Sequence, residues 1–145
     1  MADFEIIVGS VLGASEYVAD ALQEKIGEYK LTSNIRLVPD LADLDEQAIW
    51  LVCTSTHGAG DLPDNIQPFV KQLKNNVLDK VTFLVVGLGD SSYDTFCNGA
   101  LQIEALLIAQ GATLLTPALH IDVLNHPIPE VPAIAWLDNW LLSRG

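Results

Sequence analysis

The chain has 145 residues, half of them hydrophobic, and this length suits one folded domain over residues 1–145 with a complete apolar core. Its 19 acidic and 7 basic residues give a formal net charge of −12, which disfavours nucleic acids and membrane surfaces as partners and favours basic proteins. No apolar run approaches the ~20 residues that cross a bilayer, and the first residues lack a basic signal-peptide segment, so we expect a cytoplasmic protein.

Short apolar runs alternate with segments of helical spacing along the whole chain. In chain order, the predicted elements are a strand at Phe4–Gly9, a helix at Ser15–Glu28, strands at Asn34–Val38 and Ala48–Cys53, a helix at Pro63–Lys74, a strand at Val81–Val86, a helix at Phe96–Gln110, a strand within Thr113–Leu119 and a helix at Val131–Leu142. Five strands alternating with helices predict an α/β fold with one doubly wound, five-stranded parallel sheet. Ligands of such sheets bind where the strands end, so the loops after the first, third and fourth strands are the candidate site.

The loop after the first strand has the composition of an anion-binding turn. It consists of Ser10, Val11, Leu12, Gly13, Ala14 and Ser15. Backbone N–H groups converge at the start of the following helix, and the two serines add hydroxyl donors. The loop lacks the lysine of a nucleoside triphosphate loop and the three glycines of a dinucleotide loop, so a single phosphate monoester fits better. An ordinary capped turn is the alternative interpretation.

The loop after the third strand combines hydroxyl side chains with glycines. Its candidate binding residues are Thr54, Ser55, Thr56, His57, Gly58, Ala59 and Gly60. The hydroxyl groups are possible donors to the same phosphate, and the glycines allow a flat ligand to approach the backbone closely. Taken alone, His57 is equally consistent with an exposed loop histidine.

The loop after the fourth strand adds an aromatic face. Its candidate binding residues are Gly87, Leu88, Gly89, Asp90, Tyr93, Phe96 and Cys97. Tyr93 and Phe96 are alternatively packing residues, but three ligand-competent loops at one sheet edge favour a binding site. Cys53 and Cys97 form no CxxC pair, and we expect neither a disulfide nor a metal site.

Two of these segments, Ser55–Asn65 and Gly87–Cys97, resemble the flavodoxin family, and the tail Ile121–Pro129 resembles its MioC-type short-chain group. The resemblance implies the strand order 2-1-3-4-5 with helices on both faces, and non-covalently bound FMN as cofactor. It implies that Ser10 to Ser15 hold the phosphate with help from Thr54 to Thr56. The resemblance also implies that Tyr93 stacks on the outer face of the flavin ring and His57 on the inner face. The ring edge would meet backbone groups of Gly58, Ala59, Gly89 and Asp90.

A flavodoxin is an electron carrier and has no catalytic residues of its own. The resemblance therefore implies electron transfer from an NADPH-dependent flavodoxin reductase to acceptor enzymes, with biotin synthase as one candidate. We expect a monomer whose acidic surface meets basic patches on both partners. The alternatives are an FMN-dependent NAD(P)H or quinone oxidoreductase, a receiver-type signalling module, and a flavin-free binding protein on the same fold.

Overall fold

The computed structural model describes residues 2–10, 13–56 and 60–144. Its regular elements are β1 (Phe4–Gly9), α1 (Ala14–Glu28), β2 (Ser33–Arg36), β3 (Ile49–Ser55), α2 (Gln67–Lys74), β4 (Thr82–Gly89), α3 (Asn98–Ala109), β5 (Thr113–Leu114), β6 (Leu119–Asp122) and α4 (Glu130–Ser143), with 3-10 turns at Leu41–Asp43 and Asp64–Ile66. The strands pair in the order β2-β1-β3-β4-β5, and all of the pairs are parallel. The predicted α/β fold and its strand order are therefore confirmed.

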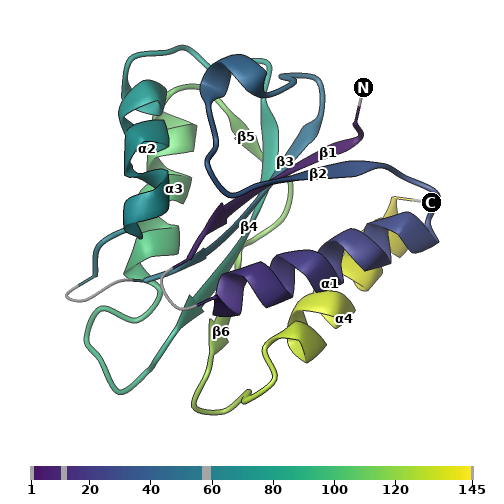
Figure 1. Cartoon of the computed structure of the whole chain (residues 1–145), viewed down its shortest axis with the longest axis vertical. Coiled ribbons are helices and arrows are strands. Elements are labelled where there is room, and N and C mark those ends of the chain that lie inside the picture. Colours follow the sequence, from purple (N-terminus) through teal and green to yellow (C-terminus); the bar gives the residue numbers. More distant parts are fainter. Residues whose placement is uncertain (1, 11–12, 57–59, 145) are drawn as a thin grey trace.

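The helices cover both faces of the sheet. Helices α1 and α4 lie side by side on one face, and α2 and α3 lie on the other (Figure 1). Strand β3 runs between these layers, and its side chains alternate between two apolar clusters. Trp50 and Val52 join the cluster under α2 and α3, whereas Leu51 and Cys53 join the cluster under α1 and α4. This position explains why the β3 sequence is apolar without alternation.

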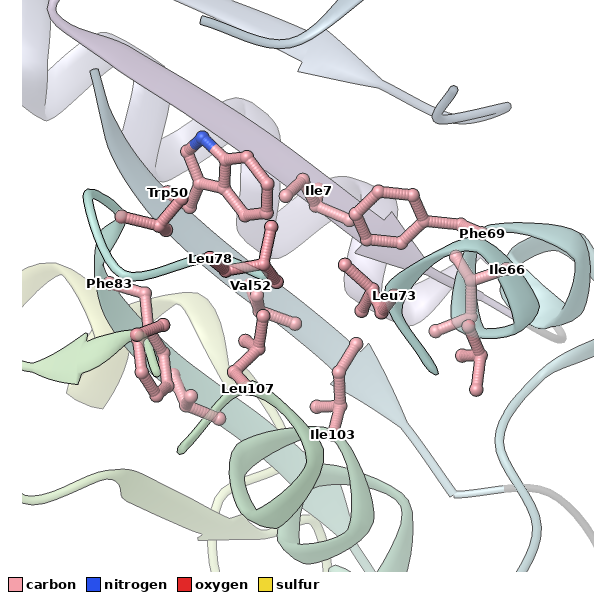
Figure 2. Packing of buried hydrophobic residues seen from close by; sticks show 14 of the residues in the cluster. Ile7, Trp50, Val52, Ile66, Phe69, Leu73, Leu78, Phe83, Ile103 and Leu107 are labelled. Carbon is pink, nitrogen blue, oxygen red and sulfur yellow. The ribbon is translucent and has the colours of Figure 1, made fainter. Parts of the chain in front are cut away.

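The cluster under α2 and α3 contains the fully buried aromatic side chains Trp50, Phe69 and Phe83. Figure 2 shows Trp50 from β3 and Phe69 from α2 on this face, with Phe83 on the neighbouring strand β4, where it is paired with Trp50. The rings of Trp50 and Phe69 have their centroids 6.1 Å apart, and both side chains are fully buried. This packing holds α2 and α3 rigidly against the sheet, and the loops at its carboxyl edge are built on that support.

The fifth edge position of the sheet is divided between two short strands, which differs from the single strand expected within Thr113–Leu119. Strand β5 pairs with the start of β4, and β6 pairs with its end. Between them, Leu115–Ala118 pass the middle of β4, and this segment contains Pro117. Proline has no N–H to give to a strand pair, so it interrupts the ladder at this point.

Pairing with β6 also lengthens β4 beyond its predicted end at Val86. Gly87, Leu88 and Gly89 were expected in a loop, but they are strand residues that lie opposite His120, Ile121 and Asp122. Strand β3 likewise continues through Thr54 and Ser55. The loop after β4 therefore starts at Asp90.

Candidate functional site

The register of the sheet brings the candidate segments to one edge. Gly9 lies beside Thr54, and Thr54 lies beside Gly87, so β1, β3 and β4 end at the same level. Strand β6 joins them, because Gly89 is paired with Asp122. Parallel strands expose their carboxyl ends together, and the loops that follow β1, β3, β4 and β6 therefore surround a common space.

The turn from β1 into α1 is built around Ser10 and Gly13. Gly13 has a φ of 92°, in the left-handed region that glycine adopts without a Cβ penalty. Its N–H donates to the Ser10 hydroxyl oxygen at 3.0 Å, and that hydroxyl donates to Glu16 Oε2 at 3.2 Å. Helix α1 then begins at Ala14 without a side-chain cap. Val11 and Leu12 lie outside the described residues.

Ser15 carries the most direct sign of a ligand in this turn. The residue is fully buried, and its hydroxyl has no hydrogen-bond partner within the part of the chain that the structure describes. An unsatisfied buried hydroxyl costs about 1–3 kcal/mol. The first N–H groups of a helix likewise lack intrahelical acceptors, and they lie at its positive end. Neutral donors at a helix N-terminus fit an anionic phosphate group.

Asn65 fixes the position of this turn, a role that its sequence position did not suggest. Its Oδ1 accepts a hydrogen bond from Ser10 N at 3.0 Å. Its Nδ2 donates to Val8 O at 2.7 Å and to Leu37 O at 2.9 Å. One side chain thus ties the exit of β1 to the segment that precedes α2. The sequence feature that could have drawn attention to Asn65 is its place at the end of a loop rich in Gly and Pro, where an amide side chain can hold neighbouring backbone groups.

The three hydroxyl residues at the end of β3 are already engaged within the chain. Thr54 is fully buried, and its hydroxyl donates to Ser55 O at 2.9 Å. The Ser55 hydroxyl donates to Gly9 O at 3.4 Å. Thr56 Oγ1 accepts a hydrogen bond from Gly99 N at 3.1 Å, and among the described residues no acceptor is recorded for its own O–H. Of the three residues, Thr56 therefore retains the donor that a phosphate requires.

Of the remaining candidate residues of this loop, the structure describes only Gly60. His57, Gly58 and Ala59 lie outside the described residues, so their assignment to the flavin ring stays a prediction. Gly60 is described and buried, and it has a φ of 106°. Its carbonyl oxygen accepts hydrogen bonds from Asn98 and Gln102 of α3. Neither of these two side chains was predicted from the sequence.

The loop after β4 presents Tyr93 to solvent. Asp90 Oδ1 accepts hydrogen bonds from the N–H and the hydroxyl of Ser92, at 2.8 and 2.6 Å. Asp90 O accepts a hydrogen bond from Tyr93 N at 3.1 Å, which closes the turn. The Tyr93 side chain is 64% exposed, whereas aromatic side chains such as Trp50 and Phe69 are fully buried. A flat aromatic ring at this edge is suited to stacking against a planar ligand.

Phe96 and Cys97 lie behind this loop. Cys97 is fully buried, and its thiol donates to Gly87 O at 3.6 Å. Burial raises the pKa of Cys97 to about 11, so the thiol stays protonated and unreactive near neutral pH. Phe96 packs edge-on against His120, with ring centroids 6.5 Å apart. These contacts are with the protein, and a contact of either side chain with a cofactor stays a prediction.

Asp122, another residue without a predicted role, joins the loops after β4 and β6. Its Oδ1 accepts hydrogen bonds from Ser91 N at 3.2 Å and from Leu124 N at 3.0 Å. Hydrogen bonding from Ser91, with that from Leu124, holds the pKa of Asp122 below its ordinary value. The carboxylate is therefore charged at neutral pH and adds to the negative charge at this edge.

Within residues 2–10, 13–56 and 60–144, no three His, Cys, Asp or Glu side chains gather as a metal site. None of the helices described is long and apolar enough to cross a membrane.

Comparison with known proteins identifies the family. The sequence model of the family described as Flavodoxin matches residues 6–136. Protein MioC of Escherichia coli K12 is 46% identical over 143 residues, and Flavodoxin YqcA of the same strain is 37% identical over 144, each match covering 97% of both chains. The solved structure of a cysteine-to-alanine mutant of flavodoxin from Pseudomonas aeruginosa is 34% identical, with a TM-score of 0.86 over 94% of this chain and 95% of that one. The chain therefore belongs to the flavodoxin family of electron carriers, and its cofactor is FMN.

Proposed function

We propose that this chain is a cytoplasmic, monomeric carrier that takes electrons from an NADPH-dependent flavodoxin reductase and delivers them to acceptor enzymes, with biotin synthase as one candidate. The observation that carries the proposal is the buried, unpartnered Ser15 hydroxyl at the start of α1, within the part of the chain that the structure describes. It supplies a donor for the FMN phosphate at the same sheet edge as the exposed ring of Tyr93. FMN supplies the redox chemistry, since it accepts and releases single electrons.

The protein residues bind and orient the cofactor. The Ser15 and Thr56 hydroxyls and the first N–H groups of α1 would hold the phosphate without a lysine or arginine. Ser10 shapes the turn instead, because its hydroxyl accepts from Gly13 N and donates to Glu16. Tyr93 covers one face of the ring system. The Cys97 thiol is protonated and faces Gly87, which is consistent with a cofactor held without a covalent bond.

The charge around the site determines its partners. Acidic side chains at this edge include Asp61, Asp90, Asp94 and Asp122, and the stretch from Val81 to Ser143 has no lysine or arginine. Opposite charges accelerate the encounter of two proteins, and salt screens them over about 10 Å at 0.1 M. A basic patch on the reductase, and one on the acceptor, would be attracted to the edge where electrons leave.

The experiment follows reduction of the FMN-loaded protein by NADPH. With a flavodoxin reductase present, the flavin absorbance should bleach, and the rate should fall as salt increases. Without the reductase, NADPH should not be consumed. Rapid NADPH oxidation by the protein alone would show an FMN-dependent oxidoreductase instead, and a salt-independent rate would reject the electrostatic encounter. Transfer to biotin synthase is tested by supplying that enzyme as the acceptor.

A further inference from the structure

We propose that Asn98 and Gln102 of α3 are positioning residues that fix the exit of the loop after β3 and thereby set the affinity for FMN. The inference rests on the proposed function, because it concerns the same cofactor site. Neither side chain is among the residues that the flavodoxin resemblance assigned to FMN.

The two side chains hold one backbone carbonyl from two directions. Gly60 O accepts hydrogen bonds from Asn98 Nδ2 at 2.8 Å and from Gln102 Nε2 at 2.6 Å. A carbonyl oxygen has two lone pairs, so both acceptor positions are used. Gly60 has a φ of 106°, and a Cβ there would lie 2.8 Å from Asn98 Nδ2 and 3.0 Å from Thr95. The chain at Gly60 is therefore held in one conformation that other residues cannot easily adopt.

The other end of the same segment is attached to the same helix. Gly99 N donates to Thr56 Oγ1 at 3.1 Å. A Cβ on Gly99 would lie 2.9 Å from Ser55 O, so α3 and the end of β3 are in close contact here. Thr56 and Gly60 are thus both anchored to the start of α3, on either side of the residues that lie outside the described part of the chain.

The start of α3 also receives the loop after β4, which carries Tyr93. The start of α3 therefore connects the two loops that flank the expected flavin ring. The hydrogen bonds to Gly60 hold the loop after β3 at a fixed distance from the loop that carries Tyr93. A cradle that is already ordered before binding costs less conformational entropy when the ligand arrives. If a Gly60 bond is removed, the exit of the β3 loop gains freedom that FMN binding must then restrict.

A purely structural role would have a different signature, and Gln110 provides the matched control. Gln102 is an exposed residue of α3, so replacing its side chain creates no cavity in the core. Gln110, at the opposite end of α3, makes the same type of bond, because its Nε2 donates to Leu73 O at 2.7 Å. That bond joins α3 to α2 and lies away from both loops. Methionine replaces glutamine with similar shape and helix propensity but without a donor.

The experiment compares Gln102→Met and Gln110→Met with the parent. FMN affinity is measured by quenching of FMN fluorescence on titration with apoprotein, and thermal unfolding of the apoprotein monitors the fold. Gln102→Met should weaken FMN binding about fivefold, the effect of one net hydrogen bond, and shift the absorption bands of bound FMN. Gln110→Met also loses one hydrogen bond, so it should lower the unfolding midpoint of the apoprotein about as much as Gln102→Met does. It should leave the FMN affinity and the spectrum of bound FMN unchanged.

Hydrogen exchange of the apoprotein tests the proposed mechanism without FMN. Amide exchange at Gly60 and Asp61 should be faster in Gln102→Met than in the parent, and unchanged in Gln110→Met. Parent-like affinity and exchange in Gln102→Met would overturn the inference, as would equal weakening by both variants. Asn98→Asp removes the other Gly60 donor, and the same two measurements on it decide the question if Gln102→Met fails to fold.

Failure of the inference can be distinguished from failure of the proposed function. If the parent binds FMN and Gln102→Met binds it equally well, the carrier function stands and the positioning role is rejected. If the parent does not bind FMN at all, the proposed function is rejected, and with it the inferred effect on affinity.

Discussion

Replacing Ser15 with alanine should change the apoprotein and the FMN complex in opposite directions. In the apoprotein the Ser15 hydroxyl is buried without a partner among the described residues, so it carries a desolvation cost of about 1–3 kcal/mol. Alanine removes that cost and loses only the small packing contribution of one oxygen atom. We expect Ser15→Ala to stabilise the apoprotein by about 1 kcal/mol, which raises the unfolding midpoint by about 2–4 °C for a chain of this size.

In the FMN complex the same hydroxyl donates to the charged phosphate. Hydrogen bonds to charged groups contribute about 1.5–3 kcal/mol, so Ser15→Ala should weaken FMN binding roughly tenfold to a hundredfold. Thermal unfolding of the apoprotein and FMN fluorescence titration measure the two effects separately. Riboflavin, which has no phosphate, should bind the parent and the variant equally.

Ser143 provides the control for this experiment. Its hydroxyl donates to Trp140 O at 2.7 Å in an exposed part of the final helix, far along the chain from the phosphate turn. Ser143→Ala should leave the FMN affinity unchanged. A Ser15→Ala apoprotein that is less stable than the parent, together with unchanged FMN affinity, would refute the assignment of Ser15 to the phosphate.

Three further predictions concern the framework around the site. Gly9→Ala should cost about 2 kcal/mol in urea unfolding, because its Cβ would overlap the Thr54 hydroxyl, and parent-like stability would mean that β1 and β3 are less closely packed. Arg36→Met removes the cation that pairs with the buried Glu5 carboxylate and leaves it only neutral donors such as Asn34, so unfolding should show a loss of about 3 kcal/mol. The double variant with Glu5→Gln should largely recover this loss, and no recovery would contradict the pairing. The hydrogen bonds that lower the pKa of Asp122 stabilise the fold above about pH 4 and lose this effect as the pH falls through that lowered value. Asp122→Asn should therefore be less stable than the parent at pH 6, with a difference that shrinks towards pH 2, and a constant difference would argue against this linkage.

The sheet was predictable where packing on both faces demands a continuous apolar run. Strand β1 has the predicted bounds at Phe4–Gly9, and β3 and β4 start within one residue of prediction. The far ends of β3 and β4 were placed too early, because glycine and hydroxyl residues resemble loop residues when read alone. In the structure Gly87 and Gly89 are strand residues since β6 pairs with them, and that pairing is a tertiary contact without a local signal.

The sequence does not reveal side chains whose role depends on a hydrogen bond or ion pair with a residue far away in the chain. Ser15 could be named as a candidate from the sequence because a hydroxyl at the start of a helix is a local pattern, and its binding role stays a prediction. The Gln102 bond to Gly60 joins residues 42 positions apart, and nothing near Gln102 in the sequence distinguishes it from other exposed helix residues. The buried Glu5 carboxylate likewise depends on a distant partner, because it pairs at 3.2 Å with Arg36, which is 31 positions away in the sequence.

Uptake of FMN by the purified apoprotein is the first property to measure. We expect one equivalent to bind, with loss of FMN fluorescence and a shift of the visible absorption bands, and the bound flavin should then be reduced by a flavodoxin reductase with NADPH. FMN that remains fluorescent and separates from the protein on gel filtration would contradict the account, because the phosphate turn and the Tyr93 loop would then lack the ligand for which they are proposed.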